Sequence, residues 1–211
     1  MAFKNEQSKV QRRPELWGGT AWENFKTDVD SAVEVLKQGG LILYPTDTVW
    51  GLGCDATNEQ AVQRVFKLKQ RDDSKSLIVL VDTESKIEHY VSEVADVAWD
   101  IIRLALRPTT VVFDGARNLA PSVVAADGSV GIRLTTEAYS RELCRRLGRA
   151  VVSTSANVSG QKAPSFFNKI QQEIRDGVDY IAAYRRRDHT PALPSQIIHI
   201  GPHGESKVIR L

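Results

Sequence analysis

The sequence predicts an α/β protein built on a mixed β-sheet. Short apolar segments of the kind that form buried strands alternate with amphipathic segments of helical spacing. The 211 residues contain no internal repeat and no low-complexity linker, and this length suits one sizeable hydrophobic core. We therefore expect one folded domain over residues 21–211. A charged segment over residues 1–20 precedes it and is expected to be dispensable for folding.

Composition and charge exclude several classes of protein. The hydrophobic fraction of 42% and the net charge of +2 are those of an ordinary globular protein, not of a polycation that coats nucleic acid. No apolar segment approaches the roughly 18 residues that a membrane-spanning helix needs, so we expect no membrane partner. The two cysteines, Cys54 and Cys144, lack metal-ligand spacing, and they favour reduced thiols in the cytoplasm.

Hydrophobic periodicity predicts the position of each element. Helices are expected at residues 24–38, from Thr57 onward through residue 68, and at residues 92–106, 138–147 and 168–175. Short apolar runs predict strands at residues 41–44, 77–81, 109–113, 131–134, 150–153, 180–183, 196–200 and 207–210. Thr57, with Gln60 three residues later, is expected to cap the second helix. Gly51–Gly53 is expected to form a turn.

The segment from Pro45 to Gly53, PTDTVWGLG, is the first candidate for a functional site. Pro45 ends a buried strand, and Thr46, Asp47 and Thr48 then bring two hydroxyls and a carboxylate to the strand edge. This group suits a pocket for a small polar ligand. An ordinary polar turn is the alternative, because turns favour the same residue types.

The second block is Lys69-Gln70-Arg71, with Lys75 shortly after it. On extended backbone, residues two apart point to the same face, so Lys69 and Arg71 are expected to present paired cations. The fork of an arginine suits phosphate oxygens, and a lysine acts as a mobile point charge. A solvated charged loop is the alternative, since Asp72 and Asp73 adjoin the block.

The third block is STSANVSG, residues 153–160, which follows a buried strand. Its small hydroxyl residues, asparagine and glycine can offer hydroxyls and backbone N–H groups to a bound anion. Ser155 and Asn157 are two residues apart and are expected to share one face. An ordinary polar loop has the same composition, and this alternative stays open on the block alone.

Taken in order, the three blocks resemble the motifs of the YrdC-like family, the L-threonylcarbamoyladenylate synthases. The resemblance continues through Val130–Arg133, Pro194–Ile198 and Val208–Arg210, so it spans most of the chain from Gly39 onward. The sequence departs from the family pattern at several positions, among them Trp50 in place of the usual tyrosine, Ser76 in place of a proline, Leu80, Arg107 and Thr135.

The resemblance implies a single-domain, twisted mixed sheet flanked by helices. It also implies a nucleotidyltransferase that joins L-threonine, bicarbonate and ATP with Mg²⁺, makes threonylcarbamoyl-AMP and releases pyrophosphate. A tRNA threonylcarbamoyl transferase would use this product for the threonylcarbamoyladenosine modification of tRNA. Carried onto this sequence, the catalytic residues are Lys69, Arg71, Ser155 and Asn157, and no residue is expected to bind a metal directly. The residues implied to bind ATP and threonine are Thr46, Thr48, Lys75, Arg133, Ser153, Ser195 and Arg210.

Missing motifs exclude other nucleotide chemistries. The sequence contains neither a GxxxxGK[ST] phosphate loop nor a GxGxxG fingerprint after a strand. The four histidines lie outside the three blocks, which argues against histidine-dependent nucleophilic catalysis.

A non-enzymatic RNA-binding module with a basic concave face is the alternative function. Arg185–Arg187, together with the arginines at positions 141, 145, 146 and 149, could contact double-stranded RNA or tRNA. A solvated helix face and a charged loop explain the same residues. The two functions differ on ATP, which an RNA module ignores, and on salt, which weakens RNA binding steeply.

Overall fold

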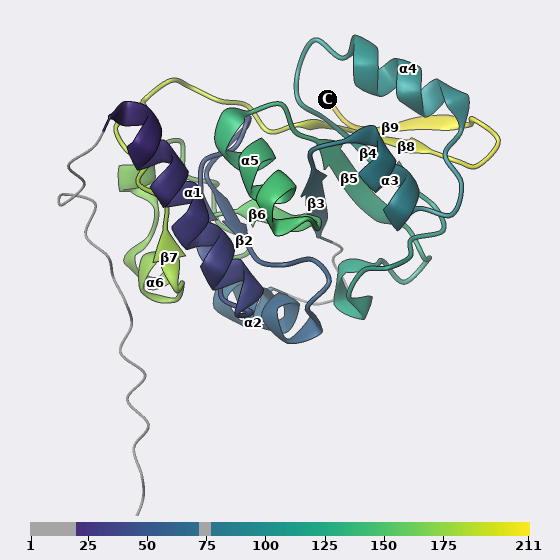
Figure 1. Ribbon diagram of the computed structural model, residues 1–211. Coiled ribbons are helices and arrows are strands. Elements are labelled where there is room, and N and C mark those ends of the chain that lie inside the picture. Colours follow the sequence, from purple (N-terminus) through teal and green to yellow (C-terminus); the bar gives the residue numbers. More distant parts are fainter. Residues whose placement is uncertain (1–19, 72–76) are drawn as a thin grey trace, which may run out of the picture.

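One mixed β-sheet of nine strands runs through the part of the chain that the computed structural model describes, residues 20–71 and 77–211 (Figure 1). The strands are β1 (Ile42–Tyr44), β2 (Gly51–Gly53), β3 (Ile78–Val81), β4 (Thr109–Phe113), β5 (Val130–Leu134), β6 (Val151–Ser155), β7 (Tyr180–Ile181), β8 (Gln196–Ile200) and β9 (Ser206–Arg210). Their order is β7-β1-β2-β6-β3-β5-β4-β8-β9. Parallel pairs, such as β3 with β5, occur beside antiparallel pairs, such as β2 with β6. The prediction of an α/β fold with a mixed sheet is therefore confirmed.

Six helices and two short 3₁₀ turns accompany the sheet in the described residues. They are α1 (Ala21–Lys37), α2 (Glu59–Lys69), α3 (Glu84–Tyr90), α4 (Asp96–Leu104), α5 (Ala138–Leu147) and α6 (Gln172–Asp176), with 3₁₀ turns η2 (Pro121–Val123) and η3 (Phe167–Lys169). In Figure 1, α1 and α5 lie side by side in front of the sheet, and α3 lies in front of its other half. None of the described helices combines the length and hydrophobicity needed to cross a membrane.

Alternate residues of the central strands face opposite sides of the sheet. Val111, Ile132 and Val152 are buried in the hydrophobic core. Val112 and Ser153, each one position further along the chain, line a pocket instead. One face of the sheet thus builds the core, and the other face builds the pocket.

The predicted N-cap of α2 is wrong by one residue. The side chain of Asn58, not Thr57, accepts the backbone N–H of Ala61, at 3.1 Å. Thr57 donates its hydroxyl to Asp55 Oδ1 at 2.7 Å, so this hydroxyl is already engaged. A capping box is found at α1 instead, where Thr20 and Glu23 bond reciprocally.

Two helix predictions differ from the structure in extent. The segment predicted as one helix over residues 92–106 is helical only in α4, and the short helix α3 before it was missed. At seven residues, α3 offers fewer than two full periods of a helical pattern. The helix predicted over residues 168–175 is divided between η3 and α6.

Gly51–Gly53 is a strand, so the prediction of a turn at this position is wrong. β2 pairs antiparallel with β1 on one side and with β6 on the other, in the middle of the sheet. Glycines weaken a strand when it is judged by local preference alone. Here the pairing on both sides supplies the stabilisation, and at Gly53 the close packing excludes any side chain. A Cβ there would lie 2.4 Å from the Val152 carbonyl oxygen and 2.7 Å from Tyr44 Cε1.

We predict that Gly53→Ala destabilises the protein by about 1–3 kcal/mol, the usual cost of overpacking, because its methyl group would meet backbone. Gly201→Ala is the matched control, since the nearest atoms to the added Cβ there belong to the flexible side chain of Glu205. Urea unfolding of the three proteins measures the difference. Equal unfolding free energies for Gly53→Ala and Gly201→Ala would show that β2 can move away from β6 at little cost.

Candidate functional site

A pocket of about 400 Å³ opens on the sheet face opposite the core. Its walls come from strands β2 to β6, from β8 and β9, and from the segments after α2 and before β8. Seven of the predicted site residues line it: Thr48, Arg71, Arg133, Ser153, Ser155, Ser195 and Arg210. Thr46, Lys69 and Asn157 do not line it, and Lys75 lies outside the described residues.

The first block forms a loop in which Thr46 supports Thr48. Thr46 Oγ1 accepts the Thr48 N–H at 3.0 Å and donates to the Val49 carbonyl at 2.8 Å. The hydroxyls of Thr46 and Thr48 also lie 3.0 Å apart. Thr46 is 2% exposed, whereas Thr48 reaches the pocket. The two threonines therefore have different roles, because only Thr48 can touch a ligand in this arrangement.

Arg133 projects from β5 into the pocket and pairs with Asp47. Its Nη2 lies 2.9 Å from Asp47 Oδ1 and 3.4 Å from the Thr48 hydroxyl. The short contact with Asp47 is a charge pair, but its geometry is not that of a hydrogen bond. Among the described residues, Arg133 Nε and Asp47 Oδ1 have no hydrogen-bond partner. A buried pair with unused polar atoms is suited to binding a polar ligand.

Arg71 and Arg210 bring two more guanidinium groups to the same pocket. Arg210 donates from Nε and Nη2 to the carbonyl oxygen of Ser195, at 3.0 and 2.7 Å. Burial, and then the charge of Arg133, lower the pKa of Arg210. Burial also lowers the pKa of Arg71. Three arginines from separate segments therefore face one pocket and favour an anionic ligand there.

Lys69 lies beside the pocket wall and is not exposed to the pocket. It is the last residue of α2, and it is 1% exposed. Its Nζ donates to the carbonyl oxygens of Ser155 at 2.5 Å and Asn157 at 2.7 Å. Gln70 follows in the left-handed conformation, with φ 49°. The expectation that Lys69 and Arg71 share one face of extended backbone is therefore wrong, because a helix end separates them.

The third block divides at the end of β6. Ser153 and Ser155 line the pocket, and so does Thr154 between them. Asn157 turns into the loop, where its Nδ2 donates to the carbonyls of Val158 and Gln161 at 2.8 and 2.9 Å. Its buried Oδ1 has no partner among the described residues. The expected shared face of Ser155 and Asn157 is not formed, because the strand ends between them.

Thr110 and Trp50 are among the lining residues that were not predicted as part of the site. Thr110, on β4, is fully buried, and its hydroxyl lies 2.9 Å from that of Ser195. The alternation of a β-branched strand after Pro108 could have identified it. The ring centroids of Trp50 and Phe167 lie 4.9 Å apart. In the sequence, Trp50 was noted only as a departure from the family pattern. Within residues 20–71 and 77–211, no three histidine, cysteine or acidic side chains are grouped so that they could hold a metal.

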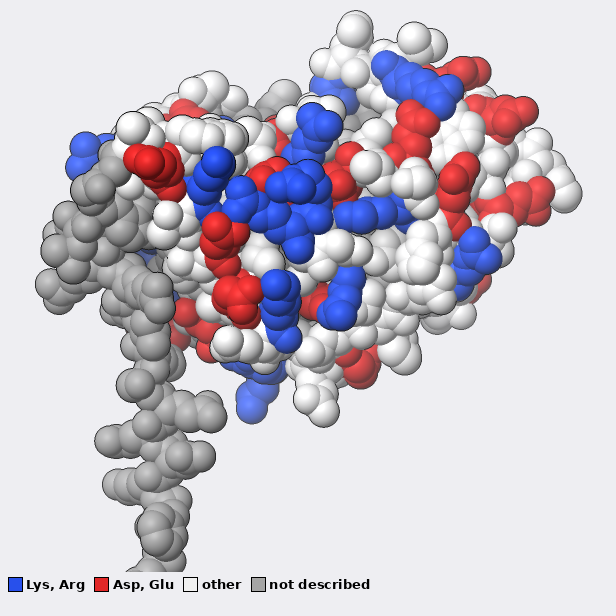
Figure 2. Space-filling view, in the orientation of Figure 1, with Lys and Arg blue, Asp and Glu red and all other residues white. Residues whose placement is uncertain are grey.

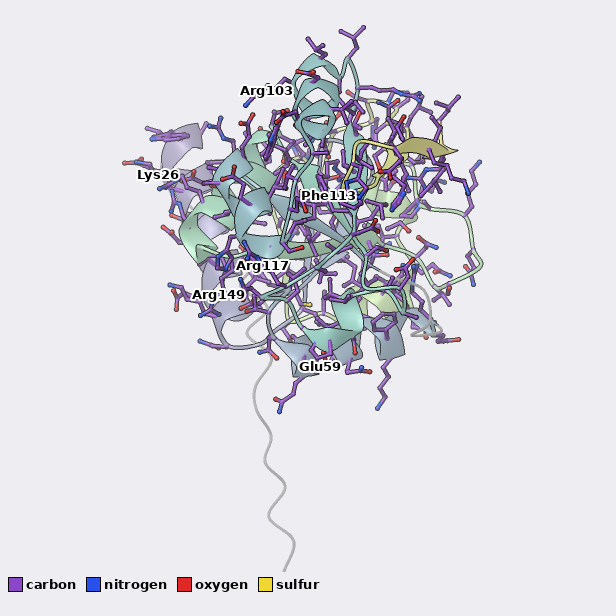
Figure 3. The ribbon with its side chains drawn as sticks, turned by 90° about the vertical axis from the view of Figure 1, so that its right-hand side faces the viewer. Lys26, Glu59, Arg103, Phe113, Arg117 and Arg149 are labelled. Atoms are coloured by element: carbon purple, nitrogen blue, oxygen red, sulfur yellow. The ribbon has the colours of Figure 1, made fainter. Side chains whose placement is uncertain are left out.

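The arginines considered for RNA binding are largely engaged within the protein. Arg145 and Arg146 both contact Glu142, and Arg149 Nη1 lies 2.6 Å from Asp55 Oδ2. Figure 2 shows basic side chains beside acidic ones over the face that carries α1 and α5. In Figure 3, Arg103 and Arg149 lie well apart. Acidic side chains therefore border the basic ones on that face.

Comparisons with known proteins identify the family. The family model Sua5/YciO/YrdC, described as "Telomere recombination", matches residues 34–211. A threonylcarbamoyl-AMP synthase of Idiomarina loihiensis is 36% identical over 145 residues, which cover 67% of this chain and 78% of that protein. The chain belongs to the Sua5/YciO/YrdC family, as its motifs indicated.

Solved structures share the fold. E. coli YciO has a TM-score of 0.72 at 23% identity, and the match covers 86% of this chain and 87% of that chain. P. abyssi Sua5 complexed with L-threonine has a TM-score of 0.73 at 22% identity, over 82% of this chain and 50% of that one. The YrdC-like fold predicted from the resemblance is confirmed.

We predict a pH-dependent stability difference between the wild type and Lys69→Met. Burial, together with the nearby charge of Arg71, lowers the pKa of Lys69 from 10.5 to about 8. Between these two pH values the unfolded chain holds the proton and the folded chain releases it, so this site favours folding more as pH rises. At pH 7, Lys69→Met should cost about 1–3 kcal/mol, because two carbonyls lose their donor. From pH 8 to pH 10 the cost should grow.

Urea unfolding at pH 7, 8.5 and 10 measures these differences. Lys67→Met is the matched control, because Lys67 is exposed on the same helix. The control should show neither the cost nor the pH trend. Parallel stability curves for wild type and Lys69→Met would contradict a lowered pKa at Lys69.

Proposed function

We propose that this chain makes threonylcarbamoyl-AMP from L-threonine, bicarbonate and ATP, with release of pyrophosphate. The observation that carries the proposal is the convergence of Arg71, Arg133 and Arg210 on one pocket of about 400 Å³ that is also lined by hydroxyls. The relationship to curated threonylcarbamoyl-AMP synthases over 67% or more of the chain supports it. No observation on the described residues favours the RNA-binding module as a second function.

The proposed chemistry requires alignment and charge neutralisation. The amine of threonine combines with bicarbonate to give a carbamate and water. A carbamate oxygen then attacks the α-phosphorus of ATP, and the bond from that phosphorus to the β-phosphate bridging oxygen breaks as pyrophosphate leaves. The nucleophile is already anionic, so positioned cations that stabilise the transition state matter more than a general base. Mg²⁺ enters with ATP as part of the substrate and offsets phosphate charge.

We assign some of the pocket residues to the phosphates of ATP and others to the amino acid. Arg71 and Arg210 both line the pocket, and their guanidinium forks suit the phosphates. Thr48 and Arg133, whose guanidinium group is paired with Asp47, suit the amino acid, because both line the pocket and lie 3.4 Å apart. The hydroxyls of Ser153 and Ser155 suit phosphate or carbamoyl oxygens. Lys69 and Asn157 act from behind the pocket wall by holding the loop after β6.

The product is a mixed anhydride, which requires a second enzyme to use it. We propose a tRNA threonylcarbamoyl transferase as that partner and the cytoplasm as the compartment. The thiols of Cys54 and Cys144, which are both free and buried, are suited to reducing surroundings.

Pyrophosphate release from ATP should require both L-threonine and bicarbonate, because their adduct is the nucleophile. Pyrophosphate is measured with each substrate omitted in turn, and the nucleotide product is identified by mass spectrometry. L-Serine should be the poorer substrate, since one methyl group in a small pocket contributes about 1–3 kcal/mol. Threonine-independent release, or a nucleotide product without a threonyl group, would rule out the proposed reaction.

A further inference from the structure

Arg185 turns into the protein, although it belongs to a run of three arginines that resembles a basic surface loop. Its Nη1 donates to the Thr46 carbonyl oxygen at 3.0 Å, and its Nε donates to Asp188 at 2.8 Å. Its Nη1 also lies 3.5 Å from Glu137, which caps the first turn of α5. The side chain is 30% exposed. Arg185 therefore joins the loop of the first block to α5 and to its own turn.

A buried carboxylate holds the backbone of this turn. Asp28, on α1, is 1% exposed and accepts the N–H groups of Ala183 and Tyr184, at 2.9 and 2.8 Å to Oδ2. The Tyr180 hydroxyl donates to Oδ1 of the same carboxylate at 2.6 Å. Arg185, the next residue, has φ 59°, a conformation that side chains other than glycine adopt at a cost. Asp28 thus holds the backbone of the two residues that precede Arg185 and so stabilises the turn from which the Arg185 side chain projects.

Thr46, which accepts the hydrogen bond from Arg185, is connected to the pocket through Thr48. Thr46 holds the Thr48 N–H, and Thr48 lines the pocket 3.4 Å from Arg133. The first block and the segment that carries Arg185 pack closely, because the cavity that both segments line has a volume of about 20 Å³. If Arg185 is removed, the Thr46 carbonyl loses its donor and the loop is free to shift.

We propose that Arg185, braced by Asp28, is a positioning residue that fixes the Thr46–Thr48 loop for binding of the amino-acid substrate. Arg185 does not line the large pocket, so it acts through Thr46 and not by contact with the ligand. The substrate part of this inference rests on the proposed function, which assigns Thr48 to L-threonine. The positioning part rests on the contacts alone.

Arg185→Gln should raise the KM for L-threonine about tenfold, the effect of losing one good hydrogen bond, while kcat and the KM for ATP stay within about twofold. Arg185→Lys should recover part of the loss, because lysine keeps a donor but not the fork. Arg187→Gln is the matched control, since Arg187 lies two residues away and is exposed. It should leave all three kinetic constants unchanged.

Hydrogen–deuterium exchange of residues 45–50 provides a readout that does not depend on activity. In Arg185→Gln this segment should exchange faster, with the rest of the chain and the melting temperature little changed. If neither the exchange nor the KM for threonine changes, the positioning role is overturned. A fall in kcat with faster exchange throughout the chain would also overturn it, because that is the signature of a general structural role. If the wild type shows no threonine-dependent reaction, the proposed function fails, and the exchange of residues 45–50 still decides the positioning role.

Discussion

The site depends on the pairing of β2 with β6. This pairing sets Gly51 opposite Ser155, and the N–H of Ala156 donates to the Trp50 carbonyl at 3.1 Å. Two polar blocks that lie far apart in the sequence therefore open onto one pocket. The pairing is possible because Gly53 has no side chain to meet the carbonyl of Val152. A requirement for backbone proximity thus explains why a glycine-rich segment forms a strand in the middle of the sheet.

The electrostatic character of the pocket depends on the groups that contact each cationic side chain. Arg133 has the carboxylate of Asp47, and Arg210 has the carbonyl of Ser195. These guanidinium groups and that of Arg71 line one partly buried pocket, where an anionic ligand would be stabilised by all three. Lys69 is different, since it is buried outside the pocket, where two carbonyl oxygens accept its hydrogen bonds. The arginines are therefore suited to bind substrate, and Lys69 is suited to hold the wall that carries the serines.

The sequence predicted the bounds of helices and strands well where the signal lay within the element itself. The helix at residues 138–147 and the strand at residues 196–200 have the predicted bounds, because each shows its own periodicity and ends at clear breakers. Gly51–Gly53 could not be recognised as a strand, since its stability comes from partners distant in the sequence. The burial of Lys69 depends on the left-handed Gln70, which no local pattern signals. The pocket position of Arg133 was available only through the family resemblance.

The central claim is that one pocket holds ATP and L-threonine together. Titration of the wild-type protein with ATP, in the absence and then in the presence of saturating L-threonine, tests it most directly. Two ligands that complete one site affect each other's affinity by the same factor. The account predicts that L-threonine tightens ATP binding, and by an equal factor that ATP tightens threonine binding. An ATP affinity that does not change with threonine, or no ATP binding at all, would contradict a shared site.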